Sequence, residues 1–213
     1  MAGRKTEGVI TIMFQYIDQT YEKKDFSQAD LRSGELKGCV FTRCLFRGTE
    51  MNEIWTTGCQ FIECDFGGAA LNASLHIRSA FTNCRFAGAN LFVSKWEDCK
   101  MTGSDFAGAY LDGITIQGGE WSYTNLRQAN LSKQTLKGIR LIEADLTECN
   151  LQKADLREAD LSGAKLTKAV LKGADLRGAK MDRIDYRSFD LTGVRIDLEQ
   201  AVNVARAYGA KVD

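Results

Sequence analysis

Large apolar side chains return at every fifth position along most of this chain. From Tyr21 to Ile196 each of these positions, which we call a centre, holds Leu, Ile, Met, Phe, Tyr or Trp, except at Thr56 and His76. A small residue often stands two positions before the centre, as in Ala154-Asp155-Leu156. A helix needs apolar residues at steps of three and four, and a half-buried strand alternates them. A strict period of five therefore predicts a solenoid, in which one short unit winds many times.

The repeated unit resembles the pentapeptide-repeat family, whose consensus is A(D/N)LXX. Ala144-Asp145-Leu146 and Ala174-Asp175-Leu176 follow that consensus. The resemblance implies an all-β fold, a right-handed quadrilateral β-helix in which four pentapeptides form one coil and the centres point inward. We expect this β-helix over residues 21–196, as about nine coils spaced by the ~4.8 Å between paired strands. Residues 1–20 are expected to form an N-terminal cap or strand, and residues 197–213 a C-terminal helix and tail that cap the solenoid and mediate dimerisation.

In such a fold, residues 20 positions apart stack on each other. All seven cysteines lie two positions before a centre, which predicts that they fill small buried slots. The alternative is a metal column of Cys44, Cys64 and Cys84, but neither histidine nor carboxylate joins it. Phenylalanines recur on one side at an interval of 20, and they predict an internal ladder of stacked rings rather than a platform for nucleic-acid bases. These centres are Phe26, Phe46, Phe66, Phe86 and Phe106.

Glycine is frequent two positions after the centre, as at Gly38, Gly48 and Gly58. These positions are where the chain leaves one side of the coil for the next. A tight corner favours positive φ, which glycine adopts without strain. We therefore expect the corners at this position of the repeat.

The two polar centres, Thr56 and His76, lie 20 residues apart and so on the same side of neighbouring coils. Bulky residues around them predict that segments 52–58 and 72–79 bulge from the coil. One interpretation is a packing irregularity that refills the core, and the other is a partner-binding patch, since irregular loops on a rigid scaffold often carry binding. The candidate patch residues are Asn52, Glu53, Ile54, Trp55, Thr56, Thr57, Asn72, His76 and Arg78.

The last residues leave the period of five and predict a helix. Asp197 is a candidate N-cap with Gln200 three positions later, which is a capping-box arrangement, and Gly209 is a stop signal. One face of this helix is apolar and must bury against the last coil or a partner subunit. Its residues are Leu198, Ala201, Val202, Ala205 and Tyr208.

The ending also resembles that of Qnr-type quinolone-resistance proteins, on the residues from Asp190 to Asp197 and from Gly209 to Val212. The segment Trp121-Ser122-Tyr123-Thr124-Asn125-Leu126 is similar to theirs as well. This resemblance implies protection of DNA gyrase and/or topoisomerase IV from quinolones by a homodimer joined at the C-terminal end and likened to a DNA duplex. Many Qnr proteins carry inserted loops, which this chain lacks. A loop role can therefore rest only on segments 52–58 and 72–79.

Charge gives little support to mimicry of DNA along the whole rod. Basic and acidic residues balance at 28 each. The stripe of residues before the phenylalanine centres carries a carboxylate only in every second coil, whereas DNA carries one negative charge per ~1.7 Å of axis. The carboxylates of this acidic stripe are Asp25, Asp65, Asp105, Asp145 and Asp185.

The residue inventory argues against an enzyme and against a cofactor or metal. There is one histidine, and the cysteines occupy buried positions of the repeat. Nor does the sequence carry a phosphate-binding glycine loop. The run Val9-Ile10-Thr11-Ile12-Met13-Phe14 is too short to span a membrane and lacks a cleavage pattern, so we expect a cytoplasmic protein. The favoured function is non-enzymatic topoisomerase protection without direct nucleic-acid binding, and the alternative is an interaction scaffold for a different protein partner.

Overall fold

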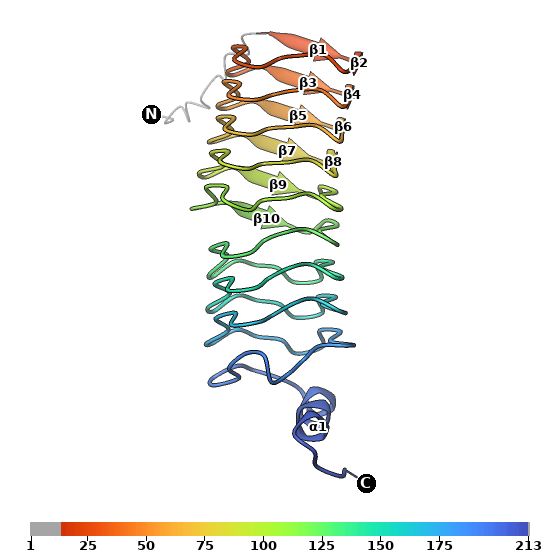
Figure 1. Cartoon of the computed structure of the whole chain (residues 1–213), viewed down its shortest axis with the longest axis vertical. Helices are drawn as coiled ribbons and strands as arrows, with labels where there is room; N and C mark the ends of the chain where they lie inside the picture. The colour runs from red at the N-terminus through yellow and green to blue at the C-terminus, as the bar shows by residue number, and fades with distance from the viewer. Residues whose placement is uncertain (1–13, 213) are drawn as a thin grey trace, which may run out of the picture.

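The computed structural model describes residues 14–212, which form a rod of stacked coils with a helix at one end (Figure 1). Two parallel sheets occupy neighbouring sides of the first coils, and their strands pair at a constant offset of 20 residues. One sheet contains β1 (Gln15–Ile17), β3 (Glu35–Lys37), β5 (Trp55–Thr57), β7 (Leu75–Ile77), β9 (Lys95–Glu97) and β10 (Thr115–Gln117). The other contains β2 (Thr20–Glu22), β4 (Val40–Thr42), β6 (Gln60–Ile62) and β8 (Ala80–Thr82).

Each coil has four sides of five residues. Columns of parallel pairing begin at Gln15, Thr20, Asp25 and Asp30, and isolated bridges with the same offset continue to the pair Asp175 and Arg195. The structure is therefore a solenoid, as the period of five predicted, and it is the right-handed quadrilateral β-helix that the family resemblance implied. Within the segment predicted as an N-terminal cap or strand, β1 already pairs with β3 and brings Tyr16 into the frame. The remainder of that segment, residues 1–13, lies outside the described residues.

The interior is filled by the centres and by the small residues two positions before them. Neighbouring rings of the predicted phenylalanine ladder stack with centroids 4.6 to 5.0 Å apart, which is the favourable range for offset aromatic pairs. A second ladder, which the sequence analysis did not single out, runs beside the first through Tyr21, Phe41, Phe61 and Phe81. The two ladders meet edge to face, for example at Phe41 and Phe46.

The seven cysteines are buried and carry free thiols, as the repeat position predicted. Six of the sulfurs, all but that of Cys149, lie near carbonyl oxygens of the preceding coil, for example Cys64 Sγ at 3.3 Å from the oxygen of Phe41. Burial raises the pKa of the Cys59 and Cys149 thiols to about 12, so both stay protonated at neutral pH. Between residues 14 and 212, no group of three or more His, Cys, Asp or Glu is placed to hold a metal ion.

The corners require positive φ whether or not glycine is present. Gly38, Gly48 and Gly58 have φ between 59° and 61°, which confirms the predicted corner position. Other residue types adopt the same left-handed conformation at this position of the repeat, including the β-branched Val93 at φ 51°. Left-handed backbone costs an L-residue about 1–2 kcal/mol, so the stacked coils impose it against local preference.

The helix α1 (Leu198–Ala207) begins with the predicted capping box. The Asp197 carboxylate accepts the backbone N–H of Gln200 at 3.0 Å, and the Gln200 side-chain oxygen accepts the N–H of Asp197 at 3.0 Å. Nothing among the described residues forms a helix long and apolar enough to cross a bilayer.

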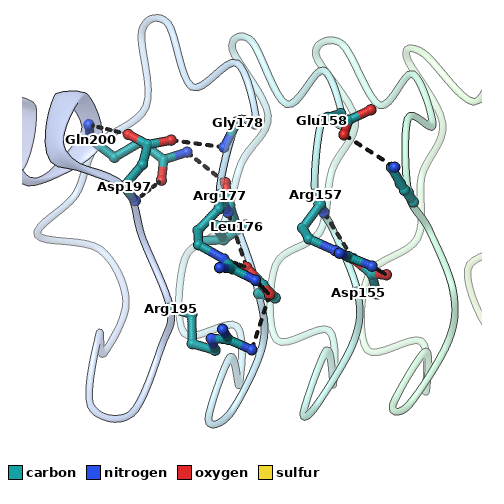
Figure 2. Close-up of polar contacts among 11 residues, drawn as sticks. Asp155, Arg157, Glu158, Leu176, Arg177, Gly178, Arg195, Asp197 and Gln200 are labelled. Carbon is teal, nitrogen blue, oxygen red and sulfur yellow. Dashed lines mark hydrogen bonds and ion pairs between the residues drawn. The ribbon is translucent and has the colours of Figure 1, made fainter.

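The same two side chains complete the hydrogen bonds of the last coil (Figure 2). In regular coils a backbone amide donates to a carbonyl 21 residues earlier, as Lys180 does to Ala159 at 2.8 Å. At the end of the solenoid the Gln200 side-chain amide instead donates to the oxygen of Ala179 at 3.0 Å and to that of Leu176 at 2.6 Å. The Asp197 carboxylate accepts the N–H of Gly178 at 2.7 Å. Both side chains therefore replace backbone groups of a missing next coil and stop the winding.

Candidate interaction surfaces

Segments 52–58 and 72–79 do not bulge, so that prediction is wrong. Thr56 and His76 lie directly opposite each other in β5 and β7, in the same register as the neighbouring coils. Both side chains are fully buried, as is Ile54. These three members of the predicted patch therefore fill the core and are not available to a partner.

A closed set of hydrogen bonds makes the polar centres acceptable inside the rod. The Ser74 hydroxyl donates to the oxygen of Leu71 at 2.6 Å, so its oxygen accepts from His76 Nε2 at 2.9 Å. On the other side of the ring, His76 Nδ1 lies 2.8 Å from the Thr56 hydroxyl, which is also 3.0 Å from Ser79 Oγ. Complete burial lowers the pKa of His76 to about 3, so the neutral imidazole is the form that fits this network.

The other predicted patch residues do reach the surface, on two adjacent sides of the rod. Glu53 and Arg78 are exposed, and the remaining members are half-buried. Asn52 Nδ2 donates to Asn72 Oδ1 of the next coil at 2.6 Å, which fixes both amides along one side. Beyond these residues, on the outer faces of β5 and β7, Trp55 pairs with Leu75, and Thr57 pairs with Ile77.

Apolar residues that the sequence analysis missed extend this surface. Phe92, Val93 and Tyr110 are 47%, 45% and 61% exposed, at positions of the repeat that face water. Phe92 follows Asn72 in the stack of coils, since its oxygen accepts the N–H of Ala73 at 2.9 Å. Their signal in the sequence was a large apolar residue away from the centre position. We call the combined surface the lateral patch: Asn52, Trp55, Asn72, Leu75, Ile77, Phe92, Val93 and Tyr110.

The lateral patch has the composition of a protein contact. Isolated apolar residues on a surface need no explanation, but neighbouring aromatic and aliphatic side chains that remain exposed are typical of interaction sites. Aromatic residues also dominate the binding energy of measured interfaces. Its rigid β-helical support lowers the entropy lost on binding.

The acidic stripe is present, but its charges are largely occupied. A bridged column runs from Asp25 through Leu45, Asp65 and Arg85 to Lys165, which places the carboxylates on one side. Arg47 pairs with Asp65 at 2.7 Å and Arg127 with Asp145 at 3.4 Å. The stripe carboxylates also accept backbone N–H groups two residues ahead. This side therefore presents paired charges rather than a continuous row of negative ones.

The C-terminal end offers a second surface. Val204 and Ala207 of α1 pack on the core, and Gln200 is buried against the last coil. This docking face differs from the predicted apolar stripe: Leu198 and Tyr208 are 81% and 65% exposed, and Ala201, Val202 and Ala205 are half-buried. The stripe therefore is not the face that docks on the solenoid, and of its residues Leu198 and Tyr208 remain exposed.

Arginine and aspartate side chains form a paired ladder beside this end (Figure 2). Arg157 donates to Asp155 at 2.6 Å, and Arg177 donates to Asp175 at 2.7 Å. These two-residue pairs repeat from coil to coil, and Arg195 also reaches Asp175 at 3.4 Å. The guanidinium of Arg177 holds the pKa of Asp175 down at about 2. The arginine side chains of these pairs are 42% and 43% exposed, so solvent screens the attraction and each pair contributes little to stability.

Comparison with known proteins agrees with the winding. The family model described as pentapeptide repeats matches in eight copies, over residues 25–54, 124–163, 144–183 and 154–193. Curated protein sequences give no match. A trypsin-treated variant of QnrB1, described as a plasmid-mediated fluoroquinolone resistance protein, has a TM-score of 0.81 at 22% identity, covering 93% of this chain and 99% of that chain. Full-length QnrB1 has a TM-score of 0.64 at 20% identity, covering 92% and 100%. At these identities the likeness establishes the fold.

Proposed function

Because this chain is a pentapeptide-repeat protein, we propose that it acts by binding another protein rather than by catalysis, and that the partner is a type II topoisomerase which it protects from quinolones. The observation that carries the proposal is the match to QnrB1 along nearly the whole of both chains. The resemblance of the C-terminal sequence to Qnr-type proteins points the same way. DNA gyrase and topoisomerase IV are the proposed targets, in the cytoplasm.

Contact with the enzyme is assigned to the lateral patch. Arginines pair with carboxylates of the acidic stripe, and 28 basic residues balance 28 acidic ones. The rod therefore exerts little long-range attraction on a groove of the enzyme that binds DNA. Affinity must then come from local desolvation of apolar side chains, which Phe92 and Tyr110 supply. The protein would engage the enzyme directly and would not bind nucleic acid itself.

A homodimer completes the proposal. The exposed stripe of α1 lies at the end of the rod, so two chains that meet there would form one longer rod (Figure 1). Leu198→Asp places a charge in that contact and should convert a dimer to a monomer without changing the fold. Sedimentation velocity measures the outcome, and a mass unchanged by this substitution would argue against the contact.

The test is gyrase supercoiling in the presence of ciprofloxacin. The purified chain should restore supercoiling, and the double variant Phe92→Ser and Tyr110→Ser should lose most of that effect, by about tenfold or more in the concentration needed. Val170→Ser is the matched control, because Val170 is 48% exposed on the same side of the rod, outside the patch.

Three outcomes separate the possibilities. Rescue that is lost in the double variant and kept in the Val170 control supports both the function and the patch. Rescue that survives the double variant moves the contact elsewhere on the rod. Absence of rescue at every concentration, with drug-free enzyme unaffected, rejects the topoisomerase proposal and leaves a scaffold for a different partner.

A further inference from the structure

A groove lined by arginine, lysine and aspartate side chains lies near the C-terminal end of the rod, where the paired ladder of Figure 2 runs. Its volume is about 330 Å³, and it spans three successive coils, since Asp155, Asp175 and Arg195 are bridged to one another at the interval of 20 residues. We call it the basic groove. The charged side chains that line it are Lys153, Asp155, Arg157, Asp175, Arg177 and Arg195.

Two arginines of the basic groove are each held by the aspartate two residues earlier. Arg157 donates from Nε to Asp155 Oδ1 at 2.8 Å and from Nη2 to Oδ2 at 2.6 Å. Arg177 makes the same two bonds to Asp175, at 2.8 and 2.7 Å. A guanidinium group has five N–H donors, so each arginine keeps three of them for a ligand. The aspartates therefore fix the planes of the two guanidinium groups without using all of their donors.

Two further cations of the groove are less engaged. Lys153 forms no ion pair with the residues between 14 and 212, and its stem lies against the Gly173 corner, where an added Cβ would be 3.2 Å from Lys153 Cγ. Arg195 approaches Asp175 only to 3.4 Å, and its side chain is 61% exposed. Four cations and two carboxylates give the groove a net charge of +2, and all four cations reach solvent.

The basic groove shares an edge of the rod with the lateral patch. Lys153 occupies the corner that Val93 occupies three coils earlier, about 14 Å away at the spacing of paired strands. On the adjoining side, Asp155 follows Trp55 and Leu75 at multiples of 20 residues. A single partner that lies along this edge can therefore contact the apolar side chains and the cations together.

We propose that the basic groove binds a carboxylate-rich segment of the protein partner that covers the lateral patch. Lys153 and Arg195 would pair with its carboxylates, and the remaining N–H groups of Arg157 and Arg177 would donate to their oxygens. Charge-assisted bonds of this kind are roughly twice as strong as neutral ones.

The lining of the groove favours a protein segment over a nucleic acid. No aromatic side chain among residues 14–212 lines it, so bases would find no stacking platform, and its two aspartates repel a row of phosphates. The inference rests on the proposed function only in requiring a protein partner, whichever protein that is.

The test is fluorescence anisotropy of a labelled peptide that alternates glutamate and glycine, titrated with the full chain. Binding should saturate and weaken with added salt, whereas the same peptide with glutamine in place of glutamate should not bind. Lys153→Gln and Arg195→Gln should each weaken binding by about fivefold, the upper range for an exposed ion pair, and together by about twentyfold. Lys165→Gln is the matched control, because this lysine is exposed on the opposite side of the rod and removes the same charge.

A labelled single-stranded oligonucleotide forms the last arm of the experiment. It should bind no more tightly than the glutamate peptide, and tighter binding that depends on Lys153 and Arg195 would make nucleic acid the ligand and overturn the proposal. Equal binding of the two peptides, or equal weakening by Lys165→Gln and Lys153→Gln, would overturn it as well. The titration contains no topoisomerase, so its failure rejects the basic groove and leaves the supercoiling test of the proposed function intact.

Discussion

His76 makes the stability of this rod sensitive to pH in a window where few other groups titrate. It is the only histidine in the chain. Its pKa falls from 6.5 to about 3 because burial excludes water from the charged form. Since the folded pKa of this base is lowered, the unfolded chain binds the proton more readily. The folded state should therefore lose stability as the pH falls below 6.5.

The size of the effect follows from the two pKa values. Each pH unit between them corresponds to about 1.4 kcal/mol of unfolding free energy, so lowering the pH from 6.5 to about 5 should cost about 2 kcal/mol. The pKa of Asp30 is lowered to about 2 by its hydrogen bond with Arg32, and that of Asp175 to about 2 by Arg177. Those carboxylates add pH dependence only below about pH 4, where unfolded aspartate protonates.

The matched variant is His76→Leu. The same inward column holds Leu36 one coil beyond Thr56, so leucine suits this environment. The Ser74 hydroxyl keeps its bond to the oxygen of Leu71, and the Thr56 hydroxyl keeps Ser79. The substitution therefore removes the titrating ring without leaving its neighbours unpaired.

Urea unfolding at about pH 7 and about pH 5 measures the prediction for both proteins. The wild type should lose about 2 kcal/mol more than the variant between the two conditions. Equal losses would mean that His76 takes up its proton inside the folded rod. The polar centre would then not be sealed from water and neutral.

Three further substitutions test the end and the corners of the solenoid. Gln200→Ala should cost about 2 kcal/mol in urea unfolding, because buried carbonyls of the last coil lose their donor, whereas Asn203→Ala on the exposed part of α1 should cost little. Val93→Gly should raise the unfolding free energy by about 1 kcal/mol by relieving left-handed strain, and a lower thermal midpoint would contradict this. Gly113→Val should destabilise, since its Cβ would lie 2.9 Å from Val93 Cγ1.

Much of the candidate site could not be read from the sequence because it depends on contacts between coils. The two polar centres, Thr56 and His76, do mark a special place in the rod, but the predicted bulge of their segments was wrong. Thr56 and His76 bond to each other across one coil, and Ser79 completes the set from 23 residues away. Phe92 and Tyr110 occupy outward positions of the repeat, so they leave the pattern of centres undisturbed.

The winding follows from the order of the residues alone, through the period of five, the inward columns and the glycine corners, and so does the capping box at Asp197 and Gln200. These features are local, because each depends on residues within one or two repeats. Which polar groups satisfy one another, which helix face docks and which apolar residues remain exposed depends on how the coils stack. Such outcomes arise from the stacking of residues about 20 positions apart, where a side chain can replace a backbone group of a missing coil.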